Sequence, residues 1–418
     1  MRNNTIKRIN NINKLLNLQD INIVKISDVY DNTVEILLEP LTYIQSCPCC
    51  NNTNVIRKGS SGNRRVRHLP LCGNKTFLLL PKIRLYCKDC MLNFTFKYSF
   101  IEGKSRYTKP YNDNLANAVT GSTVAHASEF TGTPYSTVER IFKIYLNNVK
   151  PQICAETLEL SKNTERLIIG IDDFAIRKGH SYNTGIHDLR NETLLHLVKG
   201  RKLNDLRQDK EKNPHIYDIQ PVAVVMDLAQ YYHKFAEETF PNAIRIADRF
   251  HVNRYALDAL QDVRRRVSLG LSSQNRVFLK CNKNLLSKRN DQLDEKESII
   301  LKKLLNLSSE LEEVYCWKED LIEWYDCCIN VDQATIVFDR WICSGKSLNI
   351  PEVDVALKTF ENWKQEIINY HIYRFTNAPV EGRNNKIKAI QRRYYFTRNR
   401  EYYEARIFLE CNKRALTA

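Results

Sequence analysis

At its centre the sequence carries the run Leu167-Ile-Ile-Gly-Ile-Asp-Asp173, an apolar segment of strand length that ends on two carboxylates. A second run of this kind ends at Asp227, and a third ends at Asp248, three residues before His251. Open α/β sheets place their functional groups at the carboxyl ends of their strands. Because clustered carboxylates repel one another, this arrangement predicts that a divalent cation binds between them.

The neighbouring segments predict the rest of the sheet. A meander of three strands is expected first, a helical crossover follows, and the strands that end at Asp227 and Asp248 come last; the meander strands are residues 167–176, 182–189 and 193–198. This order predicts an α/β fold with a mixed five-stranded sheet, whose first part covers residues 163–262.

The character of the sequence changes to helical at residues 263–369, which contain all four tryptophans. We therefore expect an all-α insertion with tryptophan in its core, followed by the C-terminal helices of the sheet domain at residues 370–418. A further acid, Glu381, lies near the start of one of these helices, after the N-cap candidate Asn377. Its face continues through Asn385, Lys388 and Arg392. A lone Glu on such a basic strip is commonly a salt-bridge partner, but the other acids favour a shared metal site.

Positive charge is concentrated in the N-terminal part of the chain. The formal net charge is +15, and residues 55–109 hold thirteen Lys or Arg but two acids. This concentration is typical of a protein that binds a polyanion, most simply nucleic acid, and its densest part contains Arg64, Arg65 and Arg67. A solvated basic surface is the alternative explanation.

Four of the thirteen cysteines form two Cys-x-x-Cys pairs, Cys47 with Cys50 and Cys87 with Cys90. Four thiolates at this spacing can bind zinc as a tetrahedron, with Cys72 or His68 as possible substitutes and free buried thiols as the alternative. A regular knuckle turn would point Cys49 away from the metal. We expect a zinc-binding DNA-contact element of β-structure at residues 46–107, after an N-terminal segment at residues 1–45.

Residues 108–152 predict a helix, a turn that contains Gly132 and a second helix that starts near Pro134. This pattern is that of a helix-turn-helix, in which Ser136, Thr137 and Arg140 would face DNA. A helical hairpin that only links two domains would give the same pattern.

The composition is that of an ordinary globular protein, with 43% hydrophobic and 27% charged residues. No run of about 18 apolar residues predicts a membrane span, and the first residues lack the apolar segment of a signal peptide. We expect no membrane partner and thiols kept reduced in a cytoplasm.

Three longer motifs extend this interpretation; they begin at Gly170-Ile-Asp-Asp-Phe-Ala, at Ala247-Asp-Arg-Phe-His and at Val380-Glu-Gly-Arg-Asn-Asn. Together they resemble the IS-L-three family of bacterial insertion-sequence transposases, which have a ribonuclease H-like catalytic domain with a DDE motif. The N-terminal cysteine pair and the helix-turn-helix are also similar to that family, so the resemblance covers nearly the whole chain.

The resemblance implies a catalytic triad of Asp172, Asp227 and Glu381. We prefer Asp227 to Asp248 as the second acid because the fourth strand should lie beside the first, and we expect Asp173 to support the site from the other side of the strand. Asp248 and His251 match an Asp-x-x-His motif of related transposases. Further DNA contacts are expected from basic residues next to these motifs: Arg177, Lys178, Arg383, Lys386, Lys388, Arg392 and Arg393.

The resemblance also implies an activity. Two Mg²⁺ or Mn²⁺ ions would serve metal-dependent DNA cleavage and strand transfer, and a structural Zn²⁺ would hold the N-terminal element. The expected partner is double-stranded DNA, as transposon ends with terminal inverted repeats and as target, bound by a homodimer or a higher oligomer. The resemblance further implies a bacterial cytoplasmic protein that is associated with the nucleoid. The alternatives are a DNA-binding regulator that has lost catalysis and a structure-selective ribonuclease H-like nuclease.

Overall fold

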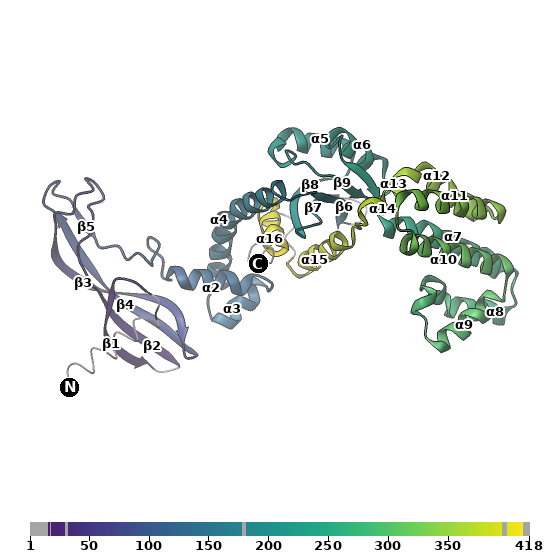
Figure 1. Cartoon of the computed structure of the whole chain (residues 1–418). Helices are drawn as coiled ribbons and strands as arrows, with labels where there is room; N and C mark the ends of the chain where they lie inside the picture. Colours follow the sequence, from purple (N-terminus) through teal and green to yellow (C-terminus); the bar gives the residue numbers. More distant parts are fainter. Residues whose placement is uncertain (1–15, 17, 30–31, 178–180, 395–398, 413–418) are drawn as a thin grey trace. The chain divides into compact units, whose positions relative to one another are not determined.

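The computed structural model describes residues 16, 18–29, 32–177, 181–394 and 399–412 (Figure 1). Contacts divide the chain into two compact units, Met1–Asn147 and Asn148–Ala418. Helix α4 crosses the division between them. None of the described helices is long and apolar enough to cross a membrane.

The first unit begins with a five-stranded sheet in the order β1-β2-β4-β3, with β5 paired to β4. Its strands are β1 Ile21–Val29, β2 Thr33–Pro40, β3 Val55–Leu71, β4 Asn74–Cys87 and β5 Asn93–Thr95. The long strands β3 and β4 form an antiparallel hairpin with irregular register at three places. Alternate residues such as Thr76, Leu78 and Leu80 are buried, as expected for a sheet with one covered face.

Three helices follow the sheet, namely α2 Lys109–Val119, α3 Val124–Thr131 and α4 Tyr135–Lys162. Threonine side chains cap the first two, since Thr108 accepts from the Tyr111 N–H and Thr123 from the His126 N–H. Gly132 ends α3 with a φ of 60°, a left-handed conformation that costs glycine little. The turn at Gly132 lies where the sequence predicts it, but two helices precede it instead of one, and α4 continues past residue 152 to Lys162.

The second unit contains a mixed five-stranded sheet in the order β10-β9-β6-β7-β8. Its strands are β6 Ile168–Arg177, β7 Ser181–Asp188, β8 Thr193–Lys199, β9 Ala223–Met226 and β10 Ile244–Ala247. The first three are antiparallel neighbours, while β9 is parallel to both β6 and β10. This confirms the predicted mixed sheet, with the fourth strand beside the first.

Alternation along the strands gives this sheet two separate cores. Ile169, Ile171 and Val224 pack with helices α5 Leu203–Lys212 and α6 Gln230–Thr239 and with the short helix η1 Pro214–Ile216. Ile168 and Val225 face the other way, toward a large helical core. Successive strand residues point to opposite faces of the sheet, and each set is buried under helices. Both faces of the sheet are therefore covered.

The helical core belongs to the expected insertion. Its elements are α7 Arg249–Gly270, α8 Ser273–Cys281, η2 Lys283–Ser287, η3 Asn290–Gln292, α9 Glu295–Leu305, α10 Ser309–Cys327, α11 Val331–Ser347, α12 Pro351–Asn362, α13 Lys364–Ile368 and α14 Tyr370–Tyr373. Helix α7 starts directly after β10 and passes unbroken through residue 263, where a boundary was expected. Its buried stripe of Val252, Ala256, Leu260 and Val263 is continuous, so the sheet and the insertion share one core.

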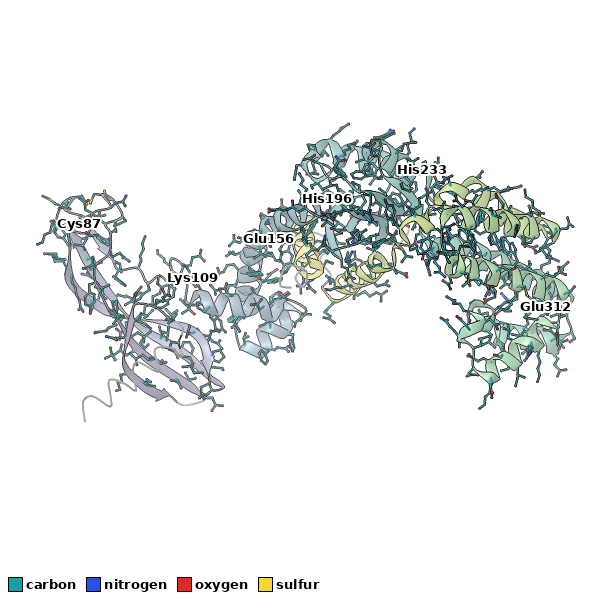
Figure 2. The ribbon with its side chains drawn as sticks, in the orientation of Figure 1. Cys87, Lys109, Glu156, His196, His233 and Glu312 are labelled. Atoms are coloured by element: carbon teal, nitrogen blue, oxygen red, sulfur yellow. The ribbon has the colours of Figure 1, made fainter. Side chains whose placement is uncertain are left out.

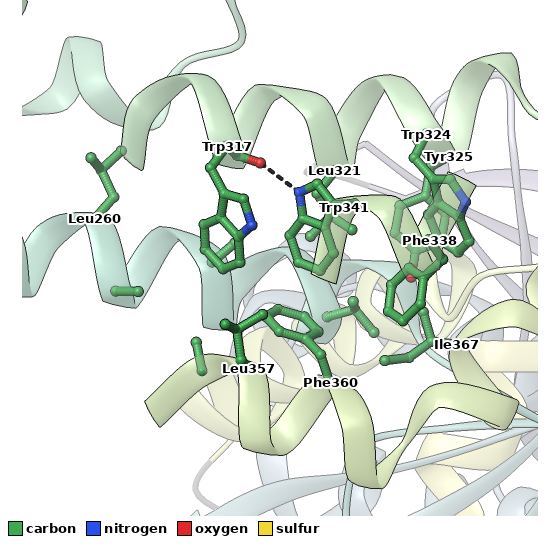
Figure 3. Packing of buried hydrophobic residues seen from close by; sticks show 14 of the residues in the cluster. Leu260, Trp317, Leu321, Trp324, Tyr325, Phe338, Trp341, Leu357, Phe360 and Ile367 are labelled. Atoms are coloured by element: carbon green, nitrogen blue, oxygen red, sulfur yellow. Dashed lines mark hydrogen bonds between the residues drawn. The ribbon is translucent and has the colours of Figure 1, made fainter. Parts of the chain in front are cut away.

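Tryptophan fills the centre of this core. Trp317 and Trp341 stack with ring centroids 4.5 Å apart, and the Trp341 Nε1–H donates to the Trp317 carbonyl at 2.8 Å (Figure 3). Trp324 donates to the Ala334 carbonyl at 2.9 Å. All three indoles are buried, and the N–H groups of Trp341 and Trp324 have backbone acceptors, which indicates a packing role. The chain then returns to the sheet with α15 Ala378–Tyr394 and α16 Arg400–Asn412.

Candidate active site

Two predicted acids meet at the carboxyl edge of the sheet. Ile171 on β6 pairs in register with Met226 on the parallel strand β9, so Asp172 and Asp227 follow at neighbouring positions. His251 joins them from the first turn of α7, with its Nε2 atom 2.9 Å from Asp227 Oδ1. One ligand atom from each of Asp172, Asp227 and His251 lies within 4.8 Å of the others.

The Asp172 carboxylate is fixed by two donors. The Asp173 N–H donates to its Oδ1 atom at 2.7 Å, and the Asn384 Nδ2 atom donates to its Oδ2 atom at 2.7 Å. Asn384 lies on α15 with 1% of its surface exposed. Each carboxylate oxygen can accept more than one bond, so a lone pair on each remains available for a cation.

Burial and negative charge disfavour ionised carboxylates here. Burial, reinforced by the charge of Asp227, raises the pKa of Asp172 to about 7. Burial lowers the pKa of His251, but the neighbouring Asp227 carboxylate outweighs this effect, and the net pKa is raised. A site that raises the proton affinity of its carboxylates also favours a bound cation, which neutralises the same charge.

The acid Asp248 occupies a different position. It is buried, and its Oδ1 atom accepts the Asn377 N–H at 2.8 Å, immediately before α15. Burial raises its pKa, although the Asn377 N–H opposes this. Asp248 thus holds the start of the helix that carries Glu381.

Helix α15 lies directly against β6. The Asn377 Nδ2 atom donates to the Ile171 carbonyl at 3.3 Å, and a Cβ atom added to Gly170 would come within 2.6 Å of Asn377 Oδ1 and 2.8 Å of Val380 Cγ2. Only glycine at position 170 permits this close approach. Glu381 lies in the first turn of α15, is exposed and is not part of the cluster around Asp172.

Asp173 points away from Asp172, as expected for successive strand residues. Its Oδ2 atom accepts the Tyr232 hydroxyl at 3.3 Å and lies 3.6 Å from an Arg201 guanidinium nitrogen. Burial raises the pKa of Asp173, while Arg201 opposes the shift. Asp173 therefore connects β6 to α6 and to the segment after β8.

The residues around Asp172 fit a divalent cation. Asp227 Oδ1 is buried and, among the residues that the structure describes, has no hydrogen-bond donor in good alignment. Carboxylate oxygens, with an imidazole beside them, are ligands that suit Mn²⁺ and, for the oxygens, Mg²⁺. Asp172 and Asp227 would hold the ion, with His251 at its side.

The four predicted zinc ligands also come together, at the ends of β3 and β4, where Figure 2 labels Cys87. Cys47 Sγ lies 3.4 Å from Cys90 Sγ, and Cys50 Sγ lies 3.5 Å from Cys87 Sγ. A tetrahedron with Zn–S bonds of about 2.3 Å has edges of about 3.8 Å, so the four sulfurs fit zinc with little movement.

Both cysteine knuckles have the same local geometry. The residues that follow them, Asn51 and Met91, have φ values of 58° and 59°. Asparagine adopts this left-handed conformation more readily than other non-glycine residues. The possible substitute ligands lie elsewhere: Cys72 is exposed, and His68 is buried between Thr108 Oγ1 at 2.9 Å and the Leu16 carbonyl at 3.1 Å. Cys49 is exposed and is not part of the cluster.

The predicted DNA contacts near the helix-turn-helix differ in accessibility. At the start of α4, Ser136 and Arg140 are exposed and Thr137 is half-buried. Arg67 instead turns inward, because its guanidinium donates to the Gly132 carbonyl at 3.2 Å and to the Thr131 carbonyl. It ties β3 to the turn between α3 and α4.

The basic residues near the acids, which are also predicted to contact DNA, likewise include both exposed and buried side chains. Lys388, Arg392 and Arg393 are partly or fully exposed on α15, and Lys386 donates to the Glu410 carbonyl. Arg383 is 9% exposed and lies 3.1 Å from His187 Nδ1, so it packs inside the protein rather than facing a ligand. The Arg177 side chain and Lys178 lie outside the described residues.

Asn384 is the functional residue that the sequence argument misses. The helical face drawn from Glu381 passes through Asn385, which is exposed, whereas its neighbour Asn384 contacts Asp172. The available signal was spacing, since Asn384 lies three residues after Glu381 and so close to it on the helix.

Comparison with known proteins gives three matches. Residues 169–407 match the ISL3 family model described as a transposase. Residues 45–90 match the model of the zinc-finger of transposases IS204, IS1001, IS1096 and IS1165. The chain is also 24% identical over 380 residues to the transposase for insertion sequence element IS1001 of Bordetella parapertussis, covering 90% of this chain and 91% of that protein.

Proposed function

Because this chain belongs to the ISL3 family of insertion-sequence transposases, with that family's zinc ribbon, we propose that it cuts an insertion sequence at its terminal inverted repeats and joins the ends to target DNA. The observation that carries the proposal is the convergence of Asp172, Asp227 and His251 at the edge of the sheet. We propose that it acts as a homodimer or a higher oligomer, because two ends must be processed together.

We propose that Asp172 and Asp227 hold the divalent cations and that Glu381 completes the triad. Glu381 forms no ion pair with any described residue, so the explanation as a salt-bridge partner has no support. It lies three residues before Asn384, which contacts Asp172, so an accessible carboxylate is available near the cluster. Asn384 and the Asp173 N–H orient the Asp172 carboxylate, while Asp248 fixes the start of α15.

In this proposal the cations, Mg²⁺ or Mn²⁺, would lower the pKa of a water or a DNA 3′-hydroxyl and neutralise charge on the attacked phosphate. The protein contributes positioning: β6 and β9 fix two carboxylates, and α15 brings the third acid. His251 lies beside Asp227 and is held by the first turn of α7. A pure DNA-binding regulator gains nothing from acids clustered near DNA phosphates.

The preference for Asp227 over Asp248 as second acid rests on their partners. Asp248 accepts a backbone N–H and is 2% exposed, so its carboxylate already has a structural role. Asp227 lies with Asp172, and its buried Oδ1 atom is 2.9 Å from the His251 ring nitrogen without the alignment of a hydrogen bond. The second environment is the one that a cation would complete.

The proposal is tested with a DNA substrate that carries the inverted repeats flanking the gene. The wild-type protein should cut at the repeat ends and join them to a second DNA only when Mg²⁺ or Mn²⁺ is added, and Glu381→Gln should bind the repeats without cutting. Binding without cleavage by the wild type would favour a regulator. Cleavage that ignores the repeats and depends on DNA shape would favour a nuclease.

A further inference from the structure

A basic groove lies on the first unit, between the β3–β4 hairpin and the segment that leads to α2. It has a volume of about 910 Å³. Six cationic residues line it: Arg64, Arg65, Lys82, Lys97, Lys104 and Arg106. None of its lining residues is acidic.

Two of these six cations are occupied by internal contacts. The Arg65 guanidinium lies 2.6 Å from Glu35 Oε1 and 3.4 Å from the centre of the Phe77 ring. Arg64 donates to the Gly103 carbonyl at 3.3 Å and to the Ser105 carbonyl. These contacts fix the walls of the groove and leave less of each guanidinium for a ligand.

The remaining four, Lys82, Lys97, Lys104 and Arg106, are exposed. Within the part of the chain that the structure describes, none of them forms an ion pair. Like charges gathered in one groove repel each other, and an anionic ligand removes this repulsion. The arrangement therefore favours a ligand with several negative charges rather than one.

One wall of the groove is apolar. Phe94, Phe96 and Tyr98 line it and are half-buried, with the Phe96 and Tyr98 ring centroids 5.1 Å apart. The Tyr98 hydroxyl donates to the Pro81 carbonyl at 2.9 Å, which fixes that ring. A strand of DNA presents regularly spaced phosphates and apolar deoxyribose faces, so its two surfaces match the cations and the aromatic wall.

We propose that this groove binds the sugar–phosphate backbone of one strand of duplex DNA through Lys82, Lys97, Lys104 and Arg106. This inference rests on the proposed function and gives the DNA contact of the first unit a location. It assigns the contact to these four residues in place of Arg64, Arg65 and Arg67, which have internal partners. Because phosphates carry no sequence, the groove sets affinity, and the exposed residues at the start of α4 are left to read bases.

The test measures binding of the full-length protein to a short duplex of arbitrary sequence over a range of salt concentrations, without added divalent cation. Two double variants remove groove cations, Lys82→Ala/Lys97→Ala and Lys104→Ala/Arg106→Ala. The matched control, Lys25→Ala/Lys296→Ala, removes the same charge from exposed positions outside the groove and outside the cysteine knuckles. Zinc content and thermal unfolding confirm that each variant is folded.

Each groove variant should lower the slope of log affinity against log salt by about 2 and weaken binding more than about tenfold at moderate salt, since each lost phosphate contact removes about 0.9 from the slope. The control should retain both the slope and the affinity. Groove variants that bind like the wild type, or a control that loses as much, would overturn the inference. This binding assay does not measure cleavage at the repeat ends. A failure of the groove proposal therefore leaves the proposed function intact, and the proposed function is tested separately by the cleavage assay.

Discussion

At the residue scale, the central feature is how Asp172 is held. The apolar runs that end on acids predict Asp172 and Asp227 as neighbours, because strand ends on parallel strands meet at one edge. The sequence could not predict the bond from Asn384, since the two residues are 212 positions apart and Asn385 is an equal candidate. Such contacts depend on how a helix is rotated against a strand, which only the packed structure determines.

Asn384→Ala should therefore impair catalysis without unfolding the protein. Loss of a residue that orients a metal ligand typically costs about 10–100-fold in metal affinity or activity. We expect a higher Mn²⁺ concentration for half-maximal cleavage and unchanged affinity for DNA, whereas a purely structural role would lower the melting temperature alone. Asn385→Ala, which removes an exposed neighbouring side chain, is the control and should behave like the wild type.

The raised pKa of Asp172 predicts a stability effect in the absence of metal. A carboxyl whose pKa is about 7 in the folded protein, against an ordinary value of 3.8, stabilises the fold below the lower value and loses this contribution as the pH rises toward 7. The Asp172→Asn variant has an amide that does not ionise, so its stability does not fall in this way as the pH rises. Above neutral pH its melting temperature should exceed that of the wild type by a few degrees, since each kcal/mol is worth about 2–4 °C in a domain of this size.

The difference should disappear at pH values below the ordinary pKa of aspartate, where both proteins are uncharged at this position. Melting curves over pH, recorded without divalent cations, give the measurement. A melting-temperature difference that stays constant with pH would show that Asp172 ionises normally.

At the scale of elements, the zinc ribbon and α15 show what local patterns can and cannot predict. The Cys-x-x-Cys spacing predicts its four ligands because each knuckle is a short local turn. The arginine cluster of β3 is less predictable, because Arg67 finds its partners in the α3–α4 turn, 64 and 65 residues away. Helical spacing likewise predicts which residues of α15 share a face. It does not predict that Arg383 is buried, because this depends on the contact with His187 of β7.

Cys87→Ser should release zinc from the first unit. Three thiolates and a hydroxyl bind zinc more weakly than four thiolates, and zinc binding contributes directly to the folding of small elements of this kind. Protein purified in the presence of reductant should carry about one zinc per chain in the wild type and little in the variant. Protease digestion should then cleave residues 45–95 of the variant first.

Cys72→Ser provides the control, because this exposed thiol lies outside the cluster. It should keep both the metal and the resistance to protease. Wild-type protein without zinc would contradict the ribbon as a metal site.

At the scale of the whole molecule, each unit has its own core and carries one kind of chemistry. The first unit combines the zinc ribbon, the basic groove and the glycine turn before α4. The second combines the acid cluster with a helical insertion. The sequence predicts this division of labour from composition, but it does not predict that α7 continues the sheet domain into the insertion, because an amphipathic helix shows no break where one domain becomes the other.

The unbroken α7 has a consequence for the site. It carries His251 in its first turn and Leu260 and Val263 in the core that the insertion shares with the sheet. Packing of α10 and α12 against α7 therefore supports the position of His251 beside Asp227. Through this helix the insertion supports the cluster of Asp172, Asp227 and His251, although its tryptophans lie in the core.

The most direct test of the catalytic account compares Asp172→Asn, Asp227→Asn and Asp248→Asn in one cleavage assay on DNA that carries the inverted repeats. The account predicts that Asp172→Asn and Asp227→Asn abolish Mg²⁺- or Mn²⁺-dependent cleavage while still binding the repeats. Asp248→Asn should retain cleavage, at a reduced rate and with a lower melting temperature, because it weakens the start of α15. Cleavage by Asp227→Asn together with none by folded Asp248→Asn would contradict the account and make Asp248 the second metal ligand.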